Sequence, residues 1–121
     1  TPEDIRARVM ELVKAANAAA RILWLYPIEP RDQGWRIVLD PFPLENLANI
    51  DMRKYHNLKP EERDVVRRGR DAARKLWRMA VIDHDFGGVY YWILIGSIPP
   101  GFTSPAIRMA FLHRVNEVRK A

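Results

Sequence analysis

Apolar residues recur at helical spacing near the start of the chain and predict a long amphipathic helix there. Thr1 suits a helix cap, Pro2 suits the first helical position, and Pro27 ends the pattern. The positions that share the inward side are Ile5, Val9, Leu12, Ala16, Ala19 and Leu23. A helix of about 24 residues spans about 36 Å. We therefore expect residues 1–25 to form an N-terminal helical arm that projects or lies across a partner.

Prolines and a glycine crowd residues 26–43, which indicates an extended connection with a short strand at 35–39. Helical spacing resumes from Leu44 to His56, and again from Pro60 to about Ile82. The inward positions of the second helix are Leu44, Leu47, Ala48 and Met52.

The stretch "VYYWILIGS" at 89–97 has the β-branched and aromatic content of a strand, but no partner strand is evident. It is interpreted as a buried helix. Ser104 and Pro105 begin a last helix. The predicted fold is therefore all-α, with four to five helices: a long N-terminal helix followed by a compact helical bundle at 44–121, in one folded unit.

The composition excludes several kinds of functional site and indicates the charge of the partner. The chain of 121 residues contains no cysteine, which excludes disulfides, thiolate metal sites and cysteine nucleophiles. Its net charge of +5 favours phosphate backbones or anionic membranes as partners. The longest apolar run, at 86–98, is too short for a membrane span, which needs about 20 residues, and no secretory signal is evident.

The segment "RDVVRRGRDAARKLWR" at 63–78 holds six arginines and one lysine. On a helical wheel, five of the arginines fall within an arc of about 80° over about four turns. They are Arg63, Arg67, Arg70, Arg74 and Arg78, and we call them the arginine stripe. A planar guanidinium donates hydrogen bonds in pairs and stays charged, which suits phosphate. Asp64 and Asp71 flank the stripe and are expected to neutralise it in part.

A second basic face is expected on the first helix, from Arg6, Lys14, Asn17 and Arg21. Two such helices would form a two-walled channel or clamp around a nucleic acid. The alternatives are that both faces are solvated, with local ion pairs, or that a basic helix lies on a membrane surface.

Catalytic groups are few. The triplet at 83–85, Asp-His-Asp, is the one compact cluster of titratable side chains, and a small hydrolase using His84 is the third functional candidate. The three histidines form no metal-binding pair. We predict no enzyme activity, no metal and no cofactor. The second functional candidate is a dimeric helix-turn-helix regulator, in which "HNLKPEE" forms the turn and residues 61–70 read DNA.

Three segments together resemble the major coat proteins of rod-shaped and filamentous viruses of hyperthermophilic archaea. They are "PEDIRARVMELVKAANAAARILW", "YPIEPRDQGW" and "RDVVRRGRDAARKLWR". In that family, small helical subunits pair and wrap double-stranded DNA in a helical filament. The resemblance implies a structural, sequence-independent DNA-binding protein of the virion. It implies phosphate contacts from Arg6, Lys14, Arg21 and the arginine stripe, and a partner that is the same chain or a related coat subunit. A surrounding lipid envelope is left open, and without the resemblance a cytoplasmic protein is expected.

Overall fold

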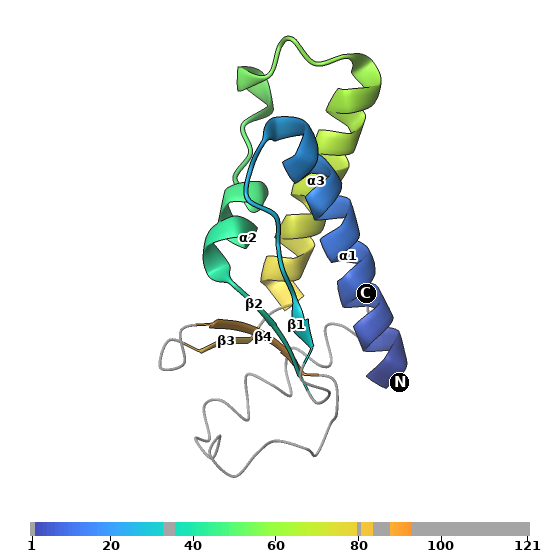
Figure 1. The fold of residues 1–121 in the computed structure, drawn as a ribbon, viewed down its shortest axis with the longest axis vertical. Coiled ribbons are helices and arrows are strands. Elements are labelled where there is room, and N and C mark those ends of the chain that lie inside the picture. Colours follow the sequence, from blue (N-terminus) through green and yellow to red (C-terminus); the bar gives the residue numbers. More distant parts are fainter. Residues whose placement is uncertain (1, 33–35, 80, 84–87, 93–121) are drawn as a thin grey trace.

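The computed structural model describes residues 2–32, 36–79, 81–83 and 88–92. Two long helices, α1 (Pro2–Leu23) and α3 (Pro60–Met79), lie side by side, and the short helix α2 (Pro41–Ala48) packs against α3 (Figure 1). A small sheet lies at one end of the helices (Figure 1). The prediction of a mostly helical fold is confirmed for the described residues.

Helix α1 ends at Leu23, before Pro27, because the backbone of Trp24 turns into the left-handed region with a φ of 56°. The Leu25 N–H then bonds to the Ala20 carbonyl at 3.0 Å, which closes the last turn in the manner of a Schellman motif. Four of the predicted inward residues are buried: Val9, Leu12, Ala16 and Ala19.

Helices α1 and α3 approach each other closely where their facing residues are small. A Cβ placed on Gly69 of α3 would lie 2.4 Å from the Ala19 Cβ and 2.9 Å from the Ala15 carbonyl oxygen of α1. Ala16, Ala72 and Ala73 are buried in the same core. Instead of projecting from the fold, α1 therefore packs along α3 and supplies part of the hydrophobic core.

The chain between α1 and the sheet is held against α1 by Asn17. Its side-chain amide donates to the Ile28 carbonyl at 2.8 Å and accepts from the Ile28 N–H at 2.7 Å. Ile28 itself is buried. Asn17 therefore has a structural role in holding this connection.

Replacing Asn17 with alanine should lower the free energy of unfolding by about 1–3 kcal/mol, because two partly buried backbone groups lose their partner. Chemical denaturation measures the change. Asn46→Ala, at an exposed position of α2, is the control and should stay within about 0.5 kcal/mol of wild type. Equal effects of the two substitutions would contradict this role for Asn17.

The predicted second helix, Leu44–His56, is wrong in its bounds. Helix α2 begins at Pro41, which occupies the first turn, and ends at Ala48, followed by a 3₁₀ turn, η1 (Met52–Lys54). The inward positions Leu44, Leu47 and Ala48 are buried as predicted, and Met52 is partly buried against the core. At the start of α3, the Glu62 carboxylate accepts the Lys59 N–H at 3.0 Å, one half of a capping box.

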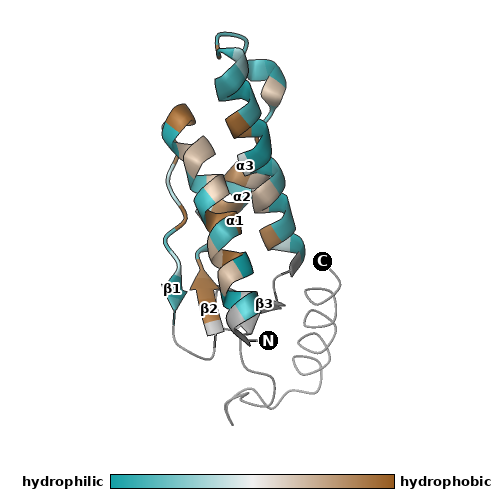
Figure 2. Ribbon diagram, turned by 90° about the vertical axis from the view of Figure 1, so that its right-hand side faces the viewer, coloured by the Kyte–Doolittle hydropathy of each residue, from teal (hydrophilic) through white to brown (hydrophobic). Residues whose placement is uncertain are grey.

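The all-α prediction is wrong in one respect, because the described residues include an antiparallel sheet of order β1-β2-β4-β3. Its strands are β1 (Arg31–Asp32), β2 (Arg36–Leu39), β3 (Val81–Asp83) and β4 (Gly88–Trp92). The short strand expected at 35–39 is confirmed as β2, which is strongly hydrophobic in Figure 2.

Helix α3 stops at Met79, short of Ile82, and residues 88–92 form a strand where a buried helix was predicted. Strand β4 pairs with β3 on one side and with β2 on the other, where Arg36 lies opposite Trp92 and Leu39 opposite Val89. Ile37, Val38 and Leu39 are all buried, so over these three residues β2 is covered on both faces and shows no alternation of polar and apolar residues. The last helix predicted from Ser104 lies outside the described residues.

Candidate nucleic-acid interface

Helix α3 divides cleanly into a buried and an exposed side. Val66, Gly69, Ala73 and Leu76 are buried toward the core. The exposed side is basic, and Figure 2 shows α3 as largely hydrophilic along its length. Within α3, seven basic and four acidic side chains give a net charge of +3. Those that are exposed and basic are Arg67, Arg68, Arg74, Lys75 and Arg78.

Two members of the arginine stripe hold the connection between α2 and α3. The Arg63 Nη1 donates to the Tyr55 carbonyl at 2.6 Å, and the Arg74 Nε donates to the Ala48 carbonyl at 2.8 Å. Arg63 is partly buried by this contact, whereas Arg74 stays exposed. These two arginines therefore stabilise the fold, in addition to any contact with a ligand.

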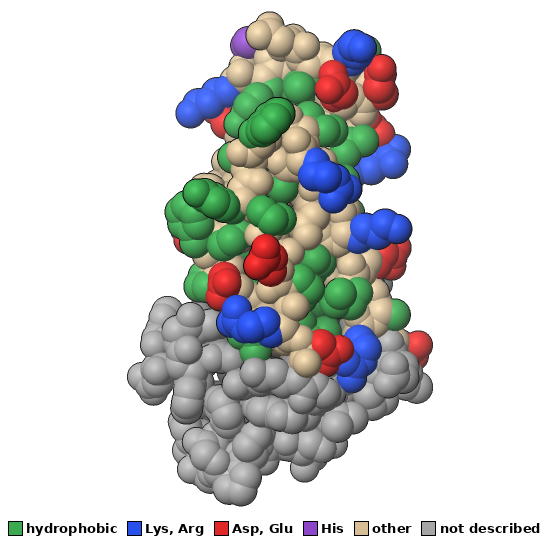
Figure 3. Space-filling model, viewed as in Figure 1, with side chains coloured by type: hydrophobic (Ala, Val, Ile, Leu, Met, Phe, Trp, Pro, Cys, Tyr) green, Lys and Arg blue, Asp and Glu red, His purple; other side chains and the backbone are tan. Residues whose placement is uncertain are grey.

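Acidic neighbours neutralise the stripe in part, as predicted. Asp64 pairs with both Arg67 and Arg68, and the Arg70 Nε lies 3.4 Å from a carboxylate oxygen of Asp71. These pairs are at the surface, where an ion pair contributes about 0–1 kcal/mol and exchanges readily for another anion. Figure 3 shows acidic side chains interspersed among basic ones on the face that it displays.

The predicted basic face of α1 is partly covered. Arg6 pairs with Asp32 of β1, and its side chain is 27% exposed. Together with the Asn17 contacts, this pair places the connection at 24–32 over that side of α1. Lys14 and Arg21 are exposed, and these two remain accessible from α1.

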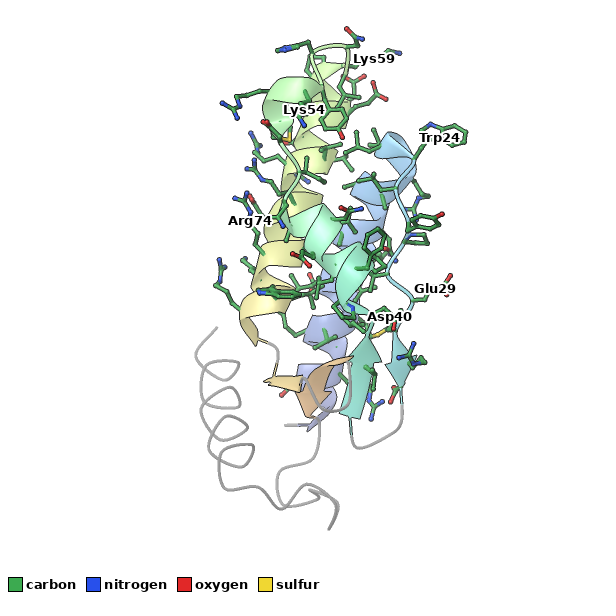
Figure 4. All side chains as sticks on the ribbon, turned by 90° about the vertical axis from the view of Figure 1, so that its left-hand side faces the viewer. Trp24, Glu29, Asp40, Lys54, Lys59 and Arg74 are labelled. Atoms are coloured by element: carbon green, nitrogen blue, oxygen red, sulfur yellow. The ribbon has the colours of Figure 1, made fainter. Side chains whose placement is uncertain are left out.

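The connection that covers part of the basic side of α1 lies away from Arg74. In Figure 4, Arg74 on α3 points to one side of the fold, while Glu29, within the connection that Asn17 and Arg6 hold, points to the other. The side of α1 that this connection covers therefore does not face Arg74.

The predicted site omitted one cation that the structure brings next to the stripe. Arg53, in η1, borders an open pocket of about 460 Å³ together with Arg70 and Arg74. The Arg53 side chain and backbone both donate to the Asp51 carboxylate, at 3.0 Å for each Oδ1 contact. Hydrogen bonding from the Arg53 side chain lowers the pKa of Asp51 below its usual value, and the same bond raises the pKa of Arg53. Both groups are therefore charged at neutral pH.

Sequence reasoning also omitted Arg68 and Lys75. Both fall outside the 80° arc of the stripe, but the structure exposes them, because α1 covers only the opposite side of α3. A helical wheel that treated every position other than glycine and apolar residues as exposed would have included both. No pattern in the sequence indicates Arg53, because Arg70 and Arg74, which lie next to it, belong to another element.

The connection between α2 and α3, from Asn49 to Lys59, is longer than the three- to four-residue turn of a helix-turn-helix. The length of this connection disfavours the regulator alternative. His84, the basis of the hydrolase alternative, lies outside the described residues.

Within the described part of the chain, no cluster of three or more histidine, aspartate or glutamate side chains could hold a metal ion. In the same residues, no helix is both long and apolar enough to cross a membrane. Comparison of the chain with protein-family models, curated proteins and solved structures finds no match.

Proposed function

We propose that this chain is a structural protein that binds the phosphate backbone of double-stranded DNA through the exposed side of α3, without reading the sequence. The observation that carries the proposal is the division of α3. One side is buried against α1 through small residues, and the other presents five exposed cations. Arg67, Arg74 and Arg78 lie two turns and then one turn apart along α3, at about 5.4 Å per turn, so they can contact several phosphates along one stretch of backbone.

The residue types favour contacts to phosphate over contacts to bases. Direct readout in the major groove commonly uses asparagine or glutamine for adenine, in addition to arginine for guanine. Helix α3 contains neither amide residue. Phosphate contacts fix position and orientation but carry no sequence information. Sequence-independent coverage of duplex DNA is therefore the role that this surface suits best.

A coat function, in which copies of this chain or a related subunit assemble along DNA in a virion, extends this proposal. It rests on the architectural resemblance and on three exposed aromatic side chains, Trp24, Tyr26 and Phe42, with Trp24 94% exposed. Aromatic residues are enriched where proteins meet. Trp24 and Arg74 point to opposite sides in Figure 4, so contacts between subunits through Trp24 would leave the α3 face open to DNA.

Titration of random-sequence duplexes at several salt concentrations tests this function. If α3 neutralises about five phosphates, the logarithm of the binding constant should fall with the logarithm of salt concentration at a slope of about −4 to −5. Duplexes of different sequence should bind with the same affinity, at a fixed number of base pairs per subunit. A flat salt response, or preference for one site by several kcal/mol, would contradict the proposal.

A further inference from the structure

An open pocket of about 460 Å³ lies between α3 and the segment that follows α2. Its wall on the α3 side is Arg70 and Arg74, which are one helical turn apart. The remaining lining residues come from one continuous segment, Asn49, Ile50, Asp51, Met52 and Arg53. Three arginines and one acidic residue, Asp51, thus line the same space.

The arginines are positioned by bonds that leave their outer groups available. Arg74 uses its Nε for the Ala48 carbonyl, at 2.8 Å, and Arg70 uses its Nε for a 3.4 Å contact to Asp71. Among the described residues, the terminal Nη groups of both side chains make no other hydrogen bond or ion pair. Each guanidinium therefore retains two nitrogen atoms that can donate.

The third cation is fixed from the other wall. Arg53 holds the Asp51 carboxylate through its Nε at 3.0 Å and one Nη at 3.2 Å. This bidentate pair satisfies the carboxylate, so that Asp51 offers less repulsion to an incoming anion than a free carboxylate would. The lining has three positive charges against one negative charge, and Asp71 lies next to Arg70 outside the lining.

We propose that this pocket seats one phosphate group of the DNA backbone, with the free Nη groups of Arg70 and Arg74 as the main donors. A tetrahedral phosphate offers several acceptor oxygens to two guanidinium forks, which bind it in a geometry that a single lysine cannot reproduce. This inference rests on the proposed function, because the phosphate in the pocket would fix the position of a subunit along the DNA backbone. The exposed Arg67, Arg68 and Lys75 then contact phosphates outside it.

NMR spectroscopy of the full chain, with inorganic phosphate as the probe, tests the pocket itself. At constant ionic strength, phosphate should shift the backbone amide signals of residues 49–53 and the Nε–H signals of Arg70 and Arg74 in a saturable manner, whereas chloride should not. The double variant R70Q/R74Q should weaken this response by about tenfold or more, since two charged hydrogen-bonding partners are lost. R67Q/R68Q removes the same charge from α3 outside the pocket and should retain the response.

The conservative variant R74K is a second test in case R70Q/R74Q does not fold, because R74K keeps the charge. It should also weaken phosphate binding, since a lysine ammonium lacks the planar fork. A response to phosphate that R74K leaves unchanged, or that R67Q/R68Q reduces as much as R70Q/R74Q does, would overturn the assignment of the pocket.

A random-sequence duplex as the second probe separates this inference from the proposed function. The same amide signals should shift when the duplex binds. If the duplex binds without shifting residues 49–53, the pocket inference fails and backbone binding through α3 stands. If inorganic phosphate or adenosine monophosphate shifts these signals while the duplex does not bind at all, both proposals fail, and the pocket takes a free phosphorylated ligand instead.

Discussion

Replacing Gly69 with alanine is expected to lower the free energy of unfolding by about 2 kcal/mol, even though alanine is the better helix former by about 1 kcal/mol. The added Cβ would lie 2.4 Å from the Ala19 Cβ and 2.9 Å from the Ala15 carbonyl oxygen. Neither neighbour is a flexible side chain that can move aside, so α1 and α3 must separate. Separation would loosen the buried residues that the two helices share.

A second substitution, Ala19→Gly, tests whether the contact with the Ala19 Cβ causes the loss of stability. In the Gly69→Ala background, Ala19→Gly removes the closest clash and should restore part of the lost stability, so that the two changes are coupled favourably. Ala7→Gly, at an exposed position of α1, reports the cost of a glycine in this helix without the contact. Urea denaturation measures the wild type, the two single variants, the double variant and the Ala7→Gly control. Stabilisation by Gly69→Ala alone would show that the two helices do not pack at this distance.

Reversing two charges on the outer side of α3 is expected to abolish most DNA binding. The variant R67E/R74E places carboxylates where phosphates are expected to bind. Its affinity for a random duplex at low salt should fall by about a hundredfold or more. The slope of the logarithm of the binding constant against the logarithm of salt concentration should become shallower by about two. Far-UV circular dichroism checks that the helices persist, because Arg74 also bonds to the Ala48 carbonyl.

A matched control distinguishes the α3 face from the charge of the whole chain. R31E/K59E reverses two exposed basic residues outside the exposed side of α3, and both double variants reduce the net charge from +5 to +1. The control should bind the duplex within about tenfold of wild type, because only long-range attraction is lost. Equal losses in the two variants would show that overall charge, and not the α3 face, governs binding.

The helices could be predicted because their signals are local. Pro60, with Glu61 and Glu62 behind it, begins α3 where the sequence indicated. The inward residues followed from spacing alone. The end of α1 at Leu23 did not, because it depends on a left-handed Trp24, a conformation that a tryptophan adopts only when its surroundings require it.

The sheet and the candidate pocket could not be predicted from the sequence, because each depends on pairing between distant segments. Strand β4 has its partner in β2, and neither strand shows alternation that would have marked it. Likewise, Arg53 meets Arg70 and Arg74 only because the chain after α2 returns along α3, held by the bonds from Arg63 and Arg74 to main-chain carbonyls. A helical wheel places residues around one helix but gives no information about the segment that crosses it.

The most direct test is a structure of the chain assembled on a random-sequence DNA duplex, in which the nearest phosphate oxygen to each α3 guanidinium is measured. We predict nitrogen-to-oxygen distances of about 2.7–2.9 Å for Arg67, Arg70 and Arg74, with no bases contacted by α3. A complex in which DNA lies against another surface, while these arginines face solvent or acidic side chains, would contradict this prediction.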